Sequence, residues 1–351
     1  MTSLLQTAPA LADTFAPAPG YLNAATLGLP PRAVHAAVRE ALDAWQRGEA
    51  CPTVYDGLVN RSRELYAQLV GVPTSWVSVG SQTSVTAGVV AASLPDGARV
   101  VCIEGDFSSM VFPFLAQAHR GVRVSQVPLE ALPDAVRGCD VVAFSLAQSS
   151  DGRVADAEAV VETAAQVGAM TFCDTTQAAG WLDVDASRFD VTVCSAYKWL
   201  CAPRGAAFTT VRPEALGRIT PVNAGWYAGE SIWDSCYGPS MRLADDARRL
   251  DVSPAWLAWV GAVPALELFH GLPTGLARDH GARLADDLRA RLDLAPERRP
   301  VVALDDADGA LAARLADAGC RVAGRAGRVR IAFHLWNDEA DVERAASALT
   351  C

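Results

Sequence analysis

The chain has 351 residues, of which 51% are hydrophobic and 20% are charged, and its formal net charge is −10. This composition is typical of a soluble globular protein that is long enough for one large domain or two. Its basic residues are scattered, whereas a nucleic-acid partner requires a clustered basic face, so no such partner is expected. No run of about 18 uninterrupted apolar residues is present, so we expect no membrane span.

The cysteines and histidines predict neither a disulfide framework nor a metal site. Nine cysteines form no CxxC pair, and their odd number together with an N-terminus that lacks a basic leader favours a cytoplasmic protein. The five histidines match no metal-binding spacing and lie far apart, at His35, His119, His270, His280 and His334.

Lysine usage is the most unusual feature of the composition. Of the 30 basic residues 29 are arginine, and the only lysine is Lys198. Codon bias in an Ala- and Arg-rich chain explains the missing lysines, and Lys198 can then be a chance survivor. Arginine, however, cannot lose its proton and attack a carbonyl, so a retained lysine also fits a role that needs a free amine. Such roles are Schiff-base formation and general-base catalysis.

The predicted elements begin with two amphipathic helices, over residues 32–47 and 57–70, and then alternate between strand and helix. Continuous apolar strands that alternate with helices predict an α/β domain with a mainly parallel sheet covered on both faces. The expected strands are 76–79, 99–103, 122–127, 140–145, 169–173, 191–194 and 206–210, and the expected intervening helices are 83–93, 108–119, 129–137 and 156–167.

The pattern changes towards the C-terminus. Helices over 253–270 and 274–291 are followed by strand and helix pairs through residue 349, which indicates a smaller α+β domain. We therefore expect an N-terminal arm over residues 1–20, a large cofactor-binding domain over 21–245, and a small C-terminal domain over 246–351 that packs with part of the N-terminal segment. In such sheets ligands bind at the C-terminal ends of the strands, so the polar residues found there are the candidates for a site.

The first candidate segment follows the expected strand 76–79. Residues 80–84 (GSQTS) join this strand to a helix, and free backbone N–H groups at a helix N-terminus favour a phosphate. Ser81, Thr83 and Ser84 can add hydroxyl groups. The same residue types also serve as ordinary N-caps.

The second candidate segment is Asp174 to Gln177, after the strand 169–173. An acidic residue at a buried strand end is unusual unless it is paired or functional, although it can also cap a helix. As a functional group, Asp174 can pair with the protonated pyridine nitrogen of a cofactor and make the ring an electron sink. Gln177 can then donate a hydrogen bond to the ring oxygen.

The third candidate segment holds the lone lysine. Lys198 lies just beyond the strand 191–194, and Ser195 supplies a hydroxyl three residues earlier. Desolvation at a buried strand end lowers the pKa of a lysine, which favours the free amine. Asp174 and Lys198 follow two successive strands and can therefore converge on one crevice.

These residues resemble the class V aminotransferase family of fold-type I pyridoxal-phosphate enzymes, which includes cysteine desulfurases, kynureninase and isopenicillin N epimerase-like proteins. The resemblance extends from Tyr21 to about Leu349, and residues 249–253 match the family's RFExGT motif only in degenerate form. The matching segments are residues 21–26 (YLNAAT), 80–83 (GSQT), 104–107 (EGDF), 174–177 (DTTQ), 195–198 (SAYK), 249–253 (RLDVS) and 329–337 (VRIAFHLWN).

The resemblance implies a role for each matching residue. Lys198 and Asp174 are the implied catalytic residues, with pyridoxal 5′-phosphate as the cofactor. Phe107 is implied to stack on the ring and Trp226 to reach a neighbouring subunit's phosphate, although both can also be packing residues. The other implied cofactor contacts are Ser81, Gln82, Thr83, Gln177, Ser195 and Tyr197. The implied substrate contacts are Asn23, Ala25 and Arg330, with Arg330 on the α-carboxylate unless it forms a surface ion pair.

The implied reaction acts on an α-amino acid through an external aldimine and a carbanion at Cα. A β-eliminating lyase of the C–S type is favoured, because no cysteine lies on a loop well before Arg330 and no second lysine offers a base on the opposite face. Whether Cys320 or Cys351 takes part in the reaction as a catalytic thiol stays open. An aminotransferase and an epimerase stay open, and a non-catalytic cofactor-binding protein is a more remote alternative. The family also implies a homodimer with its active site near the subunit interface.

Overall fold

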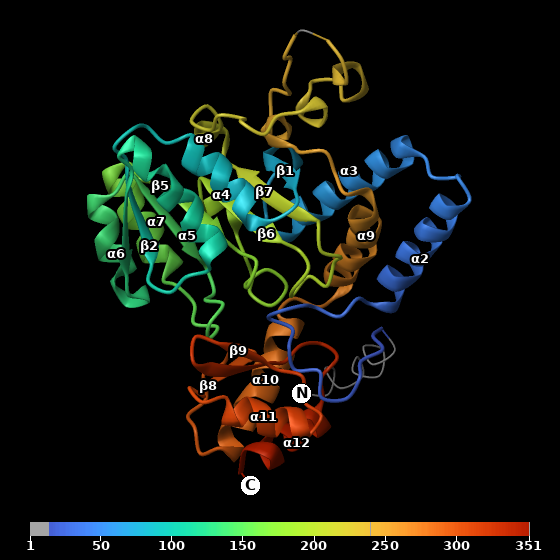
Figure 1. The fold of residues 1–351 in the computed structure, drawn as a ribbon, viewed down its shortest axis with the longest axis vertical. Helices are drawn as coiled ribbons and strands as arrows, with labels where there is room; N and C mark the ends of the chain where they lie inside the picture. The colour runs from blue at the N-terminus through green and yellow to red at the C-terminus, as the bar shows by residue number, and fades with distance from the viewer. Residues whose placement is uncertain (1–13, 239, 351) are drawn as a thin grey trace.

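The computed structural model describes residues 14–238 and 240–350. Figure 1 shows a large upper body with a central sheet, and a smaller orange-to-red body below it. The strands are β1 Val77–Gly80, β2 Arg99–Ile103, β3 Arg123–Val127, β4 Val141–Ser145, β5 Met170–Asp174, β6 Val191–Ser195, β7 Ala207–Val211, β8 Val301–Asp305, β9 Ala323–Arg325 and β10 Arg328–Ala332. The helices are α2 Arg32–Gln46, α3 Pro52–Leu69, α4 Thr83–Ala92, α5 Ser108–Leu115, α6 Leu132–Ala135, α7 Ala157–Val167, α8 Pro213–Leu216, α9 Trp256–Gly271, α10 Leu276–Arg291, α11 Ala310–Asp317 and α12 Glu339–Thr350.

Within the described residues, the large body contains a seven-stranded sheet in the order β1-β7-β6-β5-β4-β2-β3. The strands from β3 to β6 pair in parallel, whereas β7 is antiparallel to both β6 and β1. Parallel pairing brings the ends of β5 and β6 to the same edge, so Asp174 and the turn that carries Lys198 lie next to each other.

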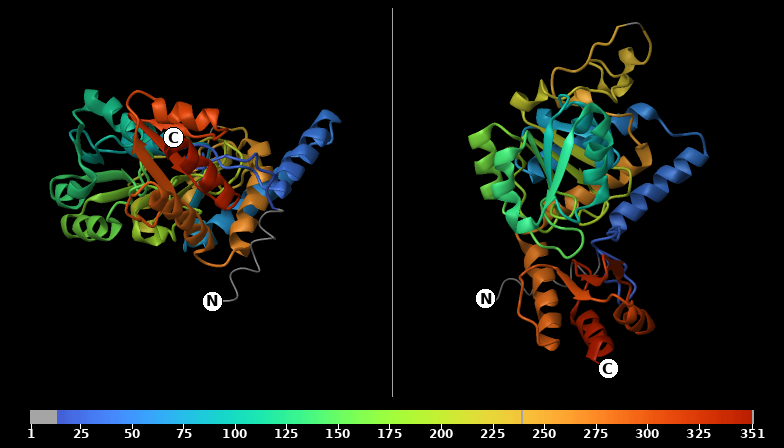
Figure 2. Two further views of the ribbon diagram at one scale, coloured as in Figure 1. Left: turned by 90° about the horizontal axis from the view of Figure 1, so that it is seen from below. Right: turned by 60° about the vertical axis from the view of Figure 1, so that its left-hand side comes forward.

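Helices cover both faces of this sheet, as its apolar strands predict. Successive strand residues point to opposite faces, so Val101 and Ile103 belong to one core cluster while Val100 and Cys102 belong to the other. The first cluster contains residues of α3, α6, α7 and α9, and the second contains residues of α4 and α5. In both views of Figure 2 the blue helix α2 extends away from this body.

The small body is an antiparallel sheet in the order β8-β10-β9, packed with α10, α11 and α12 around a core of its own. The N-terminal segment is attached to it by parallel bridges from Tyr21 to Arg321 and from Asn23 to Ala332. This segment then continues to Ala25 at the cavity described below. It therefore links the small sheet to the site.

Several details differ from the sequence-based expectations, and two of them concern helices at the edges of the large body. Residues 129–138 form the short α6 between two 3₁₀ turns instead of one helix, with Pro133 in its first turn. Helix α9 packs against α2 and α3 of the large body. The domain boundary at residue 246 stays a prediction, and this packing favours a later boundary, near residue 272. None of the helices in the described part of the chain has the length and apolarity of a membrane span.

Candidate active site

A cavity of about 430 Å³ lies where the segments that follow β2, β4 and β6 face the β9–β10 hairpin of the small body. Segments from both bodies form its wall. The lining residues are Ala25, Thr26, Gly105, Asp106, Phe107, Ser108, Ser149, Ser150, Tyr197, Lys198, Arg204, Arg325, Ala326 and Arg330.

Lys198 lies in the turn after β6 and is only 6% exposed. Its Nζ atom lies 5.4 Å from the centroid of the Phe107 ring and 5.7 Å from that of the Tyr197 ring. The backbone here is closely packed, because a Cβ on Gly28 would lie 2.0 Å from the Lys198 carbonyl oxygen. Burial lowers the pKa of Lys198 to about 8; Asp174 opposes this shift and Arg330 adds to it.

This pKa predicts how the cofactor-free protein takes up an aldehyde. At pH 7 the share of free amine at Lys198 is about 300-fold larger than for a lysine at the ordinary value of 10.5. We expect the rate of Schiff-base formation with pyridoxal phosphate to rise with pH, to be half-maximal near pH 8 and to level off above pH 9, whereas the rate for a free lysine derivative keeps rising. Stopped-flow absorbance across pH 6–10 checks this, and a rise that stays about tenfold per pH unit beyond pH 9 would contradict it.

The lowered pKa of Lys198 also makes the stability of the fold depend on pH. Between pH 8 and 10.5 the unfolded chain holds the proton on Lys198 and the folded chain does not. The contribution of Lys198 therefore favours the folded state increasingly as the pH rises through that window.

Asp174 ends β5 and is 4% exposed. Its carboxylate accepts hydrogen bonds from the Thr176 N–H at 2.8 Å and from the Thr83 hydroxyl at 3.2 Å. Burial raises the pKa of Asp174, and these hydrogen bonds and Lys198 oppose the rise. No arginine or lysine of the described residues forms an ion pair with it. A buried carboxylate of this kind fits a bound cationic ring nitrogen.

Thr83 joins the expected phosphate turn to the lysine segment. It begins α4, and its hydroxyl lies 3.2 Å from the Ser195 hydroxyl as well as 3.2 Å from Asp174. The Ser195 N–H donates to the Thr176 hydroxyl at 2.9 Å. Ser81 and Gln82 precede the helix with partly exposed and exposed side chains, so the helix N-terminus is open to an anion.

Gln177 connects the strand ends to the N-terminal segment. Its amide Nε2 donates to the Ala25 carbonyl at 2.9 Å and to the Ser149 hydroxyl at 3.2 Å. Its Oε1 accepts from the Trp199 indole at 2.8 Å. The amide plane is therefore fixed, with its donors directed towards the cavity wall.

Arg330 enters from β10 and is 1% exposed. It donates to the Ser149 carbonyl and hydroxyl and, at 2.7 Å, to the Thr26 hydroxyl. Its Nε has no hydrogen-bond partner within residues 14–238 and 240–350. Burial and the nearby Arg325 lower the pKa of Arg330 to about 10. A buried guanidinium that contacts only neutral groups is well placed to bind a carboxylate.

Arg204 and Arg325 also line the cavity, and the sequence-based reasoning missed both. The Arg204 guanidinium lies 5.2 Å from the centroid of the Tyr197 ring, and Arg325 donates to the Thr26 hydroxyl at 3.3 Å. Neither residue belongs to a recognised motif. Arg325 reaches the site only because the β9–β10 hairpin folds back on itself. An excess of arginine around residues 321–330 was the only available signal.

The other expected site residues are divided between the cavity and its surroundings. Phe107 and Tyr197 line the cavity. Asn23 lies beside β10, and its buried Oδ1 has no hydrogen-bond partner in the described part of the chain. Trp226 lies outside the lining residues and packs against Tyr227 and Trp233, so its suggested contact with a neighbouring subunit stays a prediction.

The two family-like segments at residues 249–253 and 329–337 form hydrogen bonds and an ion pair within the protein. Asp251, in the segment that resembles RFExGT, forms a buried ion pair with Arg63 on α3. His334 donates through Nε2 to the Trp199 carbonyl at 2.8 Å, since its Nδ1 accepts from the Leu335 N–H. Asn337 donates to the Tyr21 carbonyl at 3.0 Å. These contacts attach the N-terminal segment and the lysine turn to the small body.

None of the described cysteines lines the cavity. Cys320 is buried between α11 and β9, and burial raises the pKa of its thiol. Cys351 lies outside the described residues. Residues 14–238 and 240–350 also contain no group of three or more His, Cys, Asp or Glu side chains that could hold a metal ion.

A buried lysine and a buried carboxylate at adjacent strand ends, beside an open helix N-terminus and an aromatic ring, define a pyridoxal-phosphate enzyme of fold-type I. The class V aminotransferase family model matches residues 23–313, and the chain belongs to this family. The family uses pyridoxal phosphate, and the residues found here fit that cofactor.

The relatives found by sequence carry different activities in their names. The chain is 27% identical over 237 residues to YcbU of Bacillus subtilis (strain 168), named an uncharacterized aminotransferase; the match covers 64% of this chain and 62% of YcbU. It is 27% identical over 336 residues to isopenicillin N epimerase of Amycolatopsis lactamdurans, which covers 82% of this chain and 83% of the epimerase.

Solved structures share the fold at lower identity. The cystine C–S lyase C-DES superposes with a TM-score of 0.85 at 17% identity, covering 97% of this chain and 98% of that one. The cysteine desulfurase CsdA of Escherichia coli has a TM-score of 0.82 at 19% identity and covers 99% and 98% of the two chains.

Proposed function

We propose that this chain is a pyridoxal-phosphate-dependent lyase that eliminates a sulfur or similar leaving group from the β-carbon of an α-amino acid. The observation that carries the proposal is the set of reactive groups at the cavity. Lys198 supplies the only amine of the wall, no described cysteine lines it, and the other titratable lining groups are arginines, Tyr197 and Asp106. Asp106 is a lining carboxylate, but it accepts hydrogen bonds from the Ser145 N–H, the Ser145 hydroxyl and the Phe107 N–H.

The bound cofactor supplies an electron-accepting ring conjugated to the substrate nitrogen. Lys198 holds the cofactor before substrate arrives and then, as the free amine, removes the proton from Cα. Asp174 would keep the ring nitrogen of a bound cofactor protonated, and Phe107 would contact the ring. Arg330 holds the α-carboxylate, which fixes the Cα–H bond towards Lys198.

The elimination needs no further reactant except water. The electron pair of the Cα–H bond forms a double bond to Cβ, and the leaving group departs with the pair of its bond to Cβ. Water then hydrolyses the released enamine to pyruvate and ammonia. A thiol leaves with the proton that Lys198 removed.

An aminotransferase or an epimerase is the second candidate, because two relatives carry these names. Epimerisation through two bases needs a proton donor on the face opposite Lys198, and the wall of one protomer offers only arginines, Tyr197 and the engaged Asp106. A non-catalytic cofactor-binding protein is disfavoured, because Lys198, Asp174 and Arg330 are retained together.

A screen of amino acids and cysteine S-conjugates tests the proposed reaction. We expect pyruvate, ammonia and thiol in equal amounts, without any requirement for a 2-oxo acid. Cys320→Ala should release pyruvate at the wild-type rate, since this buried thiol takes no part. Turnover that requires a 2-oxo acid and leaves no pyruvate would identify an aminotransferase, and exchange of the Cα proton with inversion alone would identify an epimerase.

We also infer a cytoplasmic homodimer. Eight described cysteines are free, which fits a reducing compartment. Large apolar side chains on α2 and α3 are exposed, including Leu42, Trp45 and Val54, and such a surface fits a subunit contact. Sedimentation equilibrium should give twice the chain mass of 37.0 kDa, and a single-chain mass at micromolar concentration would contradict this inference.

A further inference from the structure

Three arginines of the β9–β10 hairpin lie on one face of the small sheet. Arg325 pairs directly with Arg328 across the hairpin, and Arg330 lies two residues further along β10. Residues that are directly opposite or two apart share a face, so all three side chains point towards the large body. Contacts with Asp151 and Ser149 of the large body are consistent with this direction.

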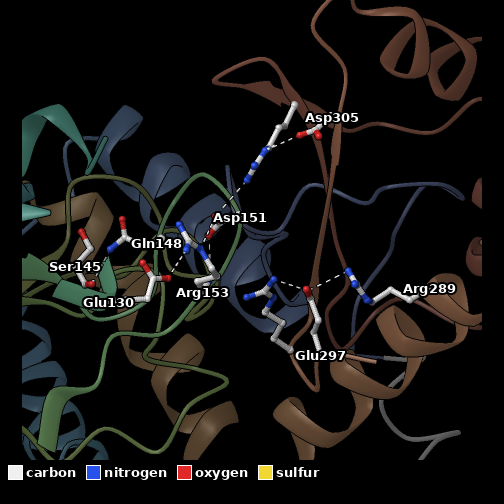
Figure 3. A network of polar contacts seen from close by, with 10 residues as sticks. Glu130, Ser145, Gln148, Asp151, Arg153, Arg289, Glu297 and Asp305 are labelled. Atoms are coloured by element: carbon white, nitrogen blue, oxygen red, sulfur yellow. Dashed lines mark hydrogen bonds and ion pairs between the residues drawn. The ribbon is translucent and has the colours of Figure 1, made fainter. Parts of the chain in front are cut away.

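Among the described residues, only one of these arginines has carboxylate partners. Arg328 forms ion pairs with Asp151 at 3.4 Å and Asp305 at 3.0 Å, two residues labelled in Figure 3. In the part of the chain that the structure describes, Arg325 and Arg330 form no ion pair. Arg328 thus joins the two bodies, while the other two cations remain available to a ligand.

Arg325 and Arg330 converge on the same neutral group. Both donate to the Thr26 hydroxyl, at 3.3 Å and 2.7 Å. Neighbouring like charges repel, and Arg325 contributes to the lowered pKa of both Arg330 and Lys198. An anion between the two guanidinium groups relieves this repulsion.

The hairpin turn directs Arg325 over the cavity. Ala326 and Gly327 form its two-residue loop with φ values of 49° and 73°, as in a tight hairpin turn with left-handed backbone. A left-handed conformation is unfavourable for alanine. Ala326 itself lines the cavity beside Arg325. The chain therefore keeps a strained residue at the point that places this arginine.

We propose that Arg325 is a specificity-determining residue that binds a second anionic group, on the side chain of the substrate. This inference rests on the proposed function, in which Arg330 holds the α-carboxylate. The preferred substrate is then an amino acid whose leaving group carries a carboxylate or similar oxyanion. Arg325 is exposed whereas Arg330 is buried, so Arg325 is the one of the pair placed to reach the outer, departing part of the substrate.

A matched pair of probes isolates the charge. S-Carboxymethyl-L-cysteine and S-carbamoylmethyl-L-cysteine have nearly the same shape, and only the first carries the second carboxylate. We expect the wild-type protein to prefer the anionic probe by roughly 10- to 100-fold in kcat/KM for pyruvate release, as charge-assisted hydrogen bonds allow. Arg325→Gln should reduce the preference to within about 3-fold by losing activity on the anionic probe alone.

Two control variants accompany this test. Arg325→Lys keeps the charge without the two-pronged geometry and should retain part of the preference. Arg123→Gln removes an equal charge from β3, whose Arg123 does not line the cavity, and should leave the preference unchanged. An equal loss on both probes in Arg325→Gln would overturn the inference, because Arg325 would then serve the cofactor or the shared α-carboxylate. A wild type without any preference would also overturn it.

A binding measurement separates this inference from the proposed reaction. Calorimetry on Lys198→Ala, which turns the probes over far more slowly than the wild type, gives dissociation constants for both with and without Arg325→Gln. A preference for the anionic probe that disappears with Arg325 supports the inference even if no pyruvate is ever released. Equal affinities in all proteins would overturn it.

Discussion

Replacing Lys198 by alanine is expected to remove the Schiff-base absorbance band and to lower turnover at least about 10²- to 10⁴-fold. The size of the effect follows from the absence of any substitute, since Lys198 is the only lysine of the chain and the other cations at the cavity are arginines. Absorbance spectra of the protein with added cofactor, together with pyruvate release, measure both effects.

Lys198→Arg is the matched control for this change. It keeps a long cationic side chain but has no amine that can lose its proton, so it should be as inactive as Lys198→Ala. Added methylamine should restore part of the turnover in Lys198→Ala and none in Lys198→Arg, whose guanidinium fills the space. An unchanged Schiff-base absorbance band in Lys198→Ala would show that Lys198 does not form the Schiff base.

Breaking the Arg63–Asp251 pair is expected to have the largest effect on stability. The two side chains are 3% and 0% exposed and lie 2.7 Å apart, and Asp251 also accepts from the Val79 N–H at 2.8 Å. Either Arg63→Met or Asp251→Asn leaves a buried group without its partner. We expect a loss of about 3–5 kcal/mol in the free energy of unfolding.

Urea unfolding followed by fluorescence measures this loss. The double variant Arg63→Met with Asp251→Leu should recover part of the stability, because two apolar side chains leave no buried charge while the Val79 N–H still loses its acceptor. Glu49→Ala removes the exposed pair with Arg47, at 57% exposure on both sides, and should cost less than about 1 kcal/mol. If the buried and the exposed changes lowered the free energy of unfolding equally, the stabilising role of the Arg63–Asp251 pair would be contradicted.

The large domain and the centre of the site could be predicted from the sequence, because local patterns encode them. Apolar runs alternating with helices gave the parallel sheet, and Asp174 and Lys198 follow two strands that prove to be neighbours. The antiparallel direction of β7 was not predictable in this way, since a buried strand has the same apolar pattern in either direction.

The parts that could not be predicted depend on contacts between distant segments. Arg325 and Thr26 are separated by 299 positions and meet only because the N-terminal segment pairs with the small sheet. The packing of α9 on α2 and α3 is equally nonlocal. Asp251 belonged to a recognised motif, but its partner Arg63 carries no signal of its own in a chain with many arginines.

One measurement on the unaltered protein tests the central claim, that pyridoxal phosphate is bound covalently through Lys198. Borohydride fixes a Schiff base as a stable amine, and trypsin does not cut after a lysine modified in this way. We predict one pyridoxyl phosphate group per chain, carried by the uncut peptide of residues 189–204. Complete cleavage after Lys198, with the group absent or attached at another position, would contradict the account.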